Sequence, residues 1–235
     1  MKTKAALATA ALGLWLAGPA AAEKKFEASL RFTPGFPLGE FGDTLDTTGL
    51  GMDLGFAYRW PGTIVSTGAS FGFLIMGSES RDEPLSATIP DLFVRVTTAN
   101  SLLLGHLFVR LQPREGLLRP YAEGLAGFHY LFTTTSISET GSWGGTLSST
   151  NLDDWAFSYG LGGGVKLALL RVRSEDSSET KTILDLDLGA RWLKGGRADY
   201  LKKGSVHRED GVVTYDVYNS RTDLLQAGIG LTVSF

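Results

Sequence analysis

Large apolar residues alternate with small or charged residues along most of this chain. In residues 50–60 the even positions are large and apolar, from Leu50 to Trp60, and the odd positions carry glycine, alanine, Asp53 or Arg59. A period of two predicts a β-strand with one apolar face. The same alternation predicts strands over residues 26–33, 65–75, 102–111, 120–132, 155–169, 182–192 and 224–235. The chain is therefore expected to be all-β, with eight strands and no helix.

The connections between these strands are expected to alternate between short and long. Short or modest connections fall at residues 60–63, 112–119 and 172–181, and long ones at residues 34–48, 77–100, 133–154 and 194–223. An up-and-down membrane barrel has short turns at one end and large loops at the other. The pattern predicts a single antiparallel transmembrane β-barrel with both termini periplasmic and long extracellular loops.

The apolar strand face can cover a soluble core or contact lipid, so a soluble, lipocalin-like barrel is the alternative. In a membrane barrel the apolar face points outward and the interior is polar. Trp60, Trp155 and Trp192 stand at expected strand ends on the apolar face, as interface aromatics do in membrane proteins. The last strand is apolar at every second position up to Phe235. These features favour the membrane barrel.

The N-terminal residues have the order of a secretory signal peptide. Lys2 and Lys4 precede an apolar run over residues 5–17, and small residues follow up to Ala22. The apolar run is too short for a spanning helix, which needs roughly 20 residues. We expect residues 1–22 to be a cleaved signal peptide and residues 23–235 to form the barrel.

Taken together, these features resemble the small eight-stranded outer-membrane β-barrel proteins of Gram-negative bacteria, the OmpX, OmpW and OmpA-barrel type. Pro120 and Tyr121, followed by Gly124 and Gly127, also resemble a strand opening common in these barrels. The resemblance implies integration into the outer membrane, with outer-membrane lipid and the barrel assembly machinery as partners. It further implies that Phe235 is the signal that this machinery reads.

Composition removes several other classes. The 235 residues include no cysteine, 22 basic and 25 acidic residues, and the formal net charge is −3. Disulfide scaffolds and thiolate metal sites are thus absent, and a nucleic-acid partner is not expected because phosphate binding needs a clustered basic surface. No cofactor site is expected.

The strand faces opposite the apolar ones carry the candidate chemistry. If the apolar faces contact lipid, ten charged side chains point into the lumen: Glu27, Arg31, Asp53, Arg59, Arg110, Glu123, Lys166, Asp185, Asp187 and Arg191. Unpaired charges in a narrow interior are costly, so five acids and five bases are expected to pair. Neighbouring strands would join Glu27 with Arg59, Arg31 with Asp53, Arg110 with Glu123, and Lys166 with Asp185 or Asp187.

Two functions of the lumen follow from this set. An eight-stranded barrel has room for its own side chains or one small ligand, which favours a structural, charge-paired interior. Many glycines also point inward, and they either leave a bore for a small-solute channel or ligand, or make room for the long arginines. We favour the second interpretation.

An enzyme that modifies membrane lipids is the less favoured alternative. His106 and His129 share the lumen face, but Glu123 lies six residues from His129, too far along a strand at about 3.3 Å per residue to orient it. No tetrahedral set of metal ligands is recognisable. The pairs Asp153–Asp154 and Glu209–Asp210 are expected to be solvated loop carboxylates. We expect a protein that is not an enzyme.

The external loops are the remaining place for a function. Residues 133–152 are rich in serine, threonine and glycine around Trp143, and residues 194–223 combine His207 and several cations with alternating apolar residues. The second segment is expected to extend the last two strands as a ribbon, or to be a plain hydrated loop. We expect a structural role or surface interaction and adhesion, with a possible extracellular partner.

Overall fold

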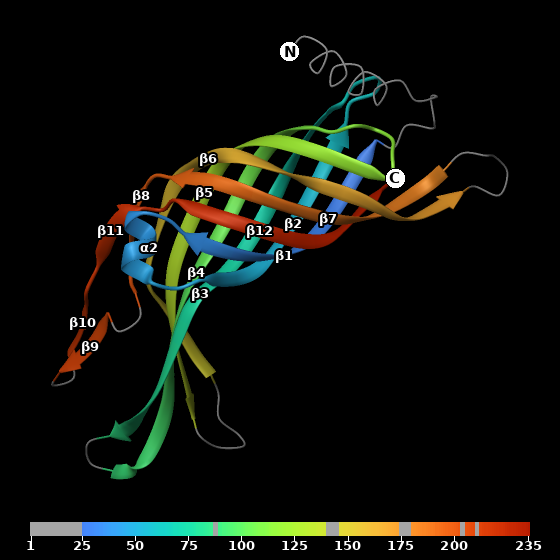
Figure 1. Cartoon of the computed structure of the whole chain (residues 1–235). Coiled ribbons are helices and arrows are strands. Elements are labelled where there is room, and N and C mark those ends of the chain that lie inside the picture. Colours follow the sequence, from blue (N-terminus) through green and yellow to red (C-terminus); the bar gives the residue numbers. More distant parts are fainter. Residues whose placement is uncertain (1–24, 87–88, 140–145, 174–179, 203–204, 210–211) are drawn as a thin grey trace.

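The structure is a computed structural model that describes residues 25–86, 89–139, 146–173, 180–202, 205–209 and 212–235. The expected signal peptide and its cleavage after Ala22 lie outside the described residues. In the part of the chain that is described, eight long strands form one closed barrel, with two small two-stranded sheets beside it (Figure 1).

Each barrel strand is longer than a typical strand in a soluble sheet. The barrel strands are β1 (Phe26–Pro37), β2 (Gly49–Arg59), β3 (Val65–Ser86), β4 (Ile89–Leu111), β5 (Leu118–Glu139), β6 (Thr146–Arg173), β7 (Thr180–Gly195) and β12 (Leu224–Ser234). The smaller elements are α2 (Glu40–Leu45), β8 (Arg197–Tyr200), β9 (Val206–Glu209), β10 (Val212–Tyr215) and β11 (Tyr218–Arg221).

The wall of the barrel is entirely antiparallel, and each strand pairs with its neighbours in the order β1-β12-β7-β6-β5-β4-β3-β2. Closure occurs where β1 meets β12. There, the amide of Phe26 donates to the carbonyl of Phe235 at 3.0 Å, and the amide of Phe235 donates back at 2.9 Å. A closed sheet leaves no unpaired edge in its wall, which is the condition for spanning lipid with strands.

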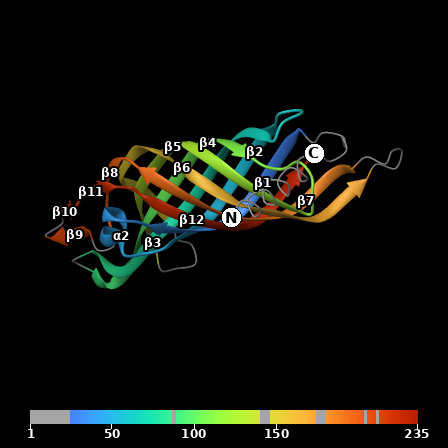
Figure 2. The same ribbon diagram turned by 45° about the horizontal axis from the view of Figure 1, so that its top comes forward.

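The barrel has two unlike ends (Figures 1 and 2). The end that holds Phe26, Phe235 and the connections at residues 60–64 and 112–117 is called the turn end here. At the opposite end, called the loop end, α2 and the β8–β11 sheet lie beside the rim, and β3, β4, β5 and β6 continue beyond it (Figure 1). The expected short connections at residues 60–63 and 112–119 thus lie together at one end, and the segments that were expected to be long loops lie at the other.

Two expectations about the loop end are corrected. Residues 77–100 and 133–154 were expected to be loops, but they mostly continue strands: Ser78 pairs with Ala99, and Ser138 with Thr146. Hydroxyl pairs such as Ser80–Thr97 at 2.9 Å and Thr98–Thr135 at 3.2 Å link neighbouring strands there. These strands lack the alternation of apolar and polar residues because they have left the barrel wall.

The expectation of no helix is wrong at α2. The helix begins after Gly39 (φ 55°) and ends at Asp46 (φ 46°), both with a positive φ, and Asp46 is in the left-handed helical conformation. Phe41 is fully buried. A six-residue helix with one anchoring residue has no periodic pattern that a sequence can reveal. Among the described residues, no helix is long and apolar enough to cross a membrane.

Apolar side chains cover the outside of the wall. Leu54 is 59% exposed and Leu107 70% exposed, and Leu30, Phe71 and Leu161 are likewise exposed on their strands. The charged residues on the alternate positions are buried inside. This distribution is the reverse of a soluble protein and contradicts the lipocalin-like alternative.

Candidate functional site in the barrel interior

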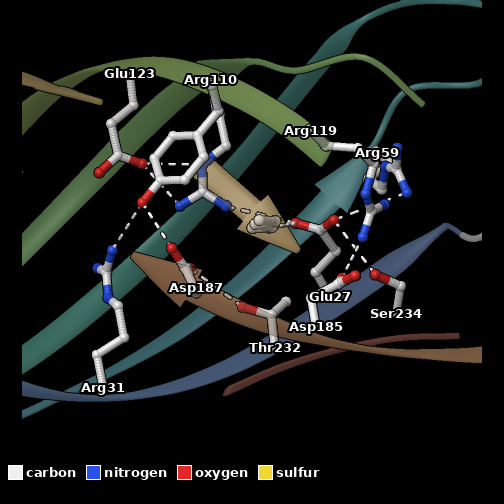
Figure 3. Close-up of polar contacts among 12 residues, drawn as sticks. Glu27, Arg31, Arg59, Arg110, Arg119, Glu123, Asp185, Asp187, Thr232 and Ser234 are labelled. Atoms are coloured by element: carbon white, nitrogen blue, oxygen red, sulfur yellow. Dashed lines mark hydrogen bonds and ion pairs between the residues drawn. The ribbon is translucent and has the colours of Figure 1, made fainter. Parts of the chain in front are cut away.

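All ten charged residues expected in the lumen point into it and are buried, with exposures of 7% or less. Near the turn end the network centres on Glu27 of β1 (Figure 3). Lys166 Nζ lies 2.7 Å from Glu27 Oε2, Arg110 Nη1 lies 3.4 Å from the same oxygen, and Arg59 Nη1 lies 3.7 Å from Oε1. The Ser234 hydroxyl donates to Oε1 at 3.4 Å. Glu27 therefore joins β1, β2, β4, β6 and β12.

The network continues through two further carboxylates. Glu123 accepts from Arg110 Nη2 at 2.7 Å and from Arg191 Nε at 2.7 Å. Asp53 accepts from Arg31 Nε at 3.2 Å and from Arg191 Nη1 at 3.0 Å. The structure thus brings together Glu27 with Arg59, Arg31 with Asp53, and Arg110 with Glu123.

The expected partner of Lys166 is corrected. Lys166 is directly opposite Asp187 in the register of β6 and β7, yet its ammonium group contacts Glu27. Asp187 instead accepts from the Tyr121 hydroxyl at 2.9 Å and from the Thr232 hydroxyl at 3.2 Å. Lys166 reaches across the lumen because a long side chain in a narrow barrel can contact strands that are not its neighbours.

Sequence reasoning missed two residues of the network, Arg119 and Tyr121. Arg119 was placed in a turn, but β5 begins at Leu118, and the Arg119 guanidinium pairs with Asp185. Tyr121 contacts Asp187 and lies beneath the Arg110 guanidinium, 4.7 Å from the ring centre. Both residues share odd-numbered positions with Glu123, so the alternation itself could have assigned them to the lumen.

The corrected inventory is not balanced. Adding Arg119 to the five expected bases gives six bases against five acids (Glu27, Asp53, Glu123, Asp185 and Asp187), all buried. Among the buried charged residues that the structure describes, bases therefore exceed acids by one.

A neutral polar layer lies next to the network. His106 Nε2 and Ser158 Oγ share a hydrogen bond of 2.6 Å, and His129 Nδ1 lies 3.2 Å from Thr222 Oγ1. The two imidazole rings meet edge to face with centroids 5.7 Å apart. All four residues are buried.

At the loop end, an apolar layer closes the lumen. Phe41 of α2 packs edge to face on Tyr200 of β8, with ring centroids 5.2 Å apart. The same buried cluster includes Leu74, Leu102, Leu193 and Leu224. Leu102 and Leu104 therefore point inward and Leu103 outward, so the three consecutive leucines still fit the alternation of the two strand faces.

The inward glycines receive large side chains. A Cβ atom at Gly68 would lie 2.2 Å from the carbonyl oxygen of Phe56 and 2.6 Å from the tip of the Phe108 ring, and one at Gly189 would lie 2.3 Å from the Tyr121 hydroxyl. These distances are too short for real contacts, so these two rings occupy the space that the glycines leave. Here the glycines make room for side chains, although aromatic ones as well as arginines.

The expected interface aromatics lie on the outer surface. Trp60, Trp155 and Trp192 are each about half exposed or more. Trp60 belongs to a turn-end group in which Tyr58 packs edge to face on it at 5.4 Å. Phe235 joins the same end, with its ring 6.1 Å from that of Phe26.

The expectation that Asp153 and Asp154 are solvated loop residues is wrong for Asp154. Both lie in β6, and Asp154 Oδ2 accepts the amide of Asp199 at 2.8 Å, which fixes β8 to β6. Trp143 and Asp210 lie outside the described residues, as do the side chains of His207 and Glu209.

The β8–β11 sheet extends the barrel, which is the first of the two alternatives for residues 194–223. Arg197 pairs with Arg221 and Tyr200 with Tyr218, so this part of residues 194–223 is a ribbon rather than a plain loop. Among the described residues, no cluster of three or more His, Asp or Glu side chains could hold a metal ion.

A closed antiparallel barrel with an apolar exterior and an ionic interior defines the class of the protein: it is a transmembrane β-barrel of the outer-membrane type. No family model and no curated protein matches the chain.

Solved structures of outer-membrane proteins are similar to it. Neisserial surface protein A is 14% identical, with coverage of 89% of this chain and 97% of that chain and a TM-score of 0.42. Ail, the attachment invasion locus protein of Yersinia pestis, solved with the heparin analogue sucrose octasulfate, is 13% identical, covers 90% and 97%, and has a TM-score of 0.34. A major outer membrane protein from Thermus thermophilus is 13% identical, covers 88% and 99%, and has a TM-score of 0.35.

Proposed function

We propose that the protein is an integral protein of the outer membrane of a Gram-negative bacterium, and that it acts through its loop end at the cell surface. The supporting observation is the filled lumen. A charged network at the turn end, a layer of histidines and hydroxyls, and an apolar layer under α2 follow one another along the barrel. The described residues that fill the barrel in this way support a role at the cell surface rather than solute transport.

The loop end has the features of an interaction surface. At the loop end, the last pair that β2 forms with β3 is Leu50 with Ile75, but β3 continues beyond it to Ser86. Strands β3 to β6 stay hydrogen-bonded to one another in this extension. These extensions of β3 to β6, called the ribbons here, are rich in serine and threonine. The helix α2 and the β8–β11 sheet lie beside them at the rim (Figure 1). With Phe26 and Phe235 together at the turn end, the expected signal peptide favours a periplasmic turn end and an extracellular loop end.

The proposal is tested by shortening one ribbon. Ser78 and Ala99 are directly paired, so residues 79–98 can be replaced by an Asn-Gly turn that suits a two-residue hairpin. Cells that display the shortened protein are expected to lose retention on polystyrene and on epithelial cells, while heat-modifiable mobility on gels is unchanged.

A matched variant isolates the ribbon. Deleting residues 206–215 removes the β9–β10 hairpin and leaves the β3–β4 ribbon intact, so retention is expected to persist. If the shortened variant folds and adheres like the parent chain, the β3–β4 ribbon is not the interaction surface.

We also propose that the Ser158–His106 pair is not a catalytic dyad. Both residues are buried inside the wall between the charged and apolar layers. A hydrolase of lipids would need its nucleophile at the lipid-facing rim. Ser158→Ala is expected to leave the lipid composition of the host membrane unchanged in mass spectra, whereas a change in lipid A or phospholipid acylation would favour the enzyme.

A further inference from the structure

At the turn end, the hairpin of β6 and β7 extends past the ends of β1 and β12 (Figures 1 and 2). The last pair between β5 and β6 is Leu118 with Leu167, but β6 continues beyond it. On the other side of the hairpin, the last pair of β12 with β7 is at Ile183. Residues 169–173 of β6 and residues 180–184 of β7 opposite them are called the arm here.

A β-bulge determines which side chains of the arm point outward. The register of β6 and β7 shifts after Ala168, and Leu169 is the extra residue. In the wall, odd-numbered residues of β6 such as Leu161 point outward, so an unbroken strand would place Arg171 on the outer side. One extra residue exchanges the two faces of the strand beyond it. After the bulge, the even-numbered Leu170 therefore takes the outer side.

The outer side of the arm is apolar and open. Leu170 is 56% exposed and Val172 47% exposed. Leu170 is opposite Leu184 of β7, which stands on the same strand face as the exposed Leu188 of the wall. The pairing thus places Leu170 and Val172 on the side of the sheet that carries the apolar exterior of the barrel.

The other side of the arm is bound to the rim. The Arg171 guanidinium donates from Nη2 to the carbonyl of Gly116 at 2.9 Å. The amide of Ala168 donates to the carbonyl of Leu117, also at 2.9 Å. Both acceptors belong to the connection at residues 112–117, so the arm is held against this turn with its apolar side outward.

The apolar side of the arm continues the outer wall of β6. Apart from the small Gly163, the outer face of β6 is apolar from Trp155 through Leu161 to Val172. A tilted strand needs about 9–11 residues to cross the hydrocarbon core of a bilayer, and β2 has 11. The apolar face over residues 155–172 is longer than the core requires, so its end at the arm reaches the headgroup layer.

We propose that the arm is an interfacial anchor whose outer side contacts the phospholipid headgroups and the acyl-chain boundary of the leaflet at the turn end. An exposed apolar patch marks a protein or membrane contact. Lipid is the partner that fits, because the patch is continuous with the lipid-facing wall and its residues Leu170, Val172, Thr182 and Leu184 carry no charge. The inference is independent of the proposed surface role of the loop end.

Nitroxide labels test this contact, since the chain has no native cysteine. Leu170→Cys is labelled and refolded into phosphatidylcholine vesicles, and collisions of the label with oxygen and with a water-soluble nickel complex are measured. Oxygen is enriched in lipid and the nickel complex in water. The label at Leu170 is expected to collide more often with oxygen, and less often with nickel, than a label in water.

Leu117→Cys is the matched control, and Leu54→Cys in β2 is the lipid reference. Leu117 is 64% exposed and is bonded to Ala168 next to the arm, but it has the odd-numbered position of the lumen residue Arg119. Its label is expected to be fully accessible to nickel. Equal nickel accessibility at Leu170 would place the arm in water. Low collision rates with both reagents would show a protein cover, such as a second copy. Either result would overturn the proposal.

Deletion of Leu169 tests the bulge. A regular strand would return Arg171 to the outer side and turn Val172 away from it. In a deletion variant that keeps its heat-modifiable mobility, a label at Val172→Cys is expected to lose oxygen collisions and gain nickel collisions relative to the same label in the parent chain. Unchanged rates would show that the bulge does not direct the apolar side to lipid, and the proposed anchor would be wrong.

Discussion

At the scale of single residues, Arg110 shows how the lumen holds a charge. Its guanidinium bonds Glu123, reaches Glu27, and lies 4.6 Å and 4.7 Å from the ring centres of Phe108 and Tyr121. Removing one partner of a buried pair costs about 3–5 kcal/mol because the other charge remains buried. Arg110→Ala is therefore expected to lower the free energy of unfolding by about that amount, as measured by guanidinium titration in detergent micelles.

The coupling between the two partners can be measured directly. Glu123→Ala is also expected to destabilise, and the double variant is expected to lose less than the sum of the two single losses. Arg197→Ala is the exposed control, since its pair with Glu40 is 58% and 56% exposed and should contribute less than about 1 kcal/mol. Strict additivity of the two lumen substitutions would show that Arg110 and Glu123 do not act as a pair.

Leu54 tests the outward face of the wall. It lies in the middle of β2 and is 59% exposed. An arginine there should cost roughly 2–4 kcal/mol if the surroundings are lipid, measured by unfolding from lipid vesicles. Leu117 is similarly exposed but lies in a turn beyond the strands, and Leu117→Arg should be nearly neutral. Similar losses for both variants would argue against a lipid-facing Leu54.

At the scale of elements, the contact between β1 and β12 allows the stability of the folded barrel to be distinguished from its assembly in cells. The Phe26 ring contacts Phe56, Tyr58 and Phe235, whereas among these aromatic contacts Phe235 has only Phe26. Phe26→Ala should therefore destabilise the folded barrel more than Phe235→Ala. If Phe235 is the signal that the assembly machinery reads, the order is reversed for the amount of heat-modifiable barrel recovered from cells.

The two measurements for this seam use the same pair of variants. Unfolding of purified protein gives the stability order, and quantitative gels of membrane fractions give the assembly order. An assembly yield that simply follows stability would remove the special role of Phe235.

The strands that could be predicted from the sequence are those that line the membrane. In β2, lipid on one side and the charged lumen on the other force apolar and polar residues to alternate, and the expected limits of 50–60 differ from the observed Gly49–Arg59 by one residue. The ribbon parts of β3 to β6 face no such contrast, so hydrogen bonding alone defines them and their sequence resembles a loop. The helix α2 could not be predicted for the same reason, since Phe41 is its one fully buried residue.

The sequence allowed prediction of those ion pairs of the lumen that join neighbouring strands. Arg31 with Asp53 and Arg110 with Glu123 are directly opposite in the register, and register follows from the alternation. The contact of Lys166 with Glu27 joins β6 to β1 across the lumen. The alternation in a single sequence carries no information on such contacts.

At the scale of the whole molecule, the layers of side chains in the lumen predict that the barrel does not conduct ions. The parent protein in planar bilayers is expected to show no stable conductance steps, because charged, polar and apolar side chains fill the lumen in turn. Phe41→Ala removes the buried side chain of α2 but leaves the Glu27 network, so this variant should show no conductance steps either. Reproducible steps in the parent chain would instead support a small-solute channel, and steps in Phe41→Ala alone would assign the seal to α2.

The contacts inside the lumen also affect how the barrel folds and inserts into the membrane. Glu27 on the first strand meets Lys166, 139 positions later, and Ser234 on the last strand, 207 positions later. Contacts so distant in sequence form late and slowly. Until β12 arrives, Glu27 lacks Ser234 and Asp187 lacks Thr232, and the charged face of the partial sheet is open to hydrocarbon or water. A partly assembled sheet is therefore unstable in the bilayer. This chain is expected to insert in a single all-or-none event rather than hairpin by hairpin.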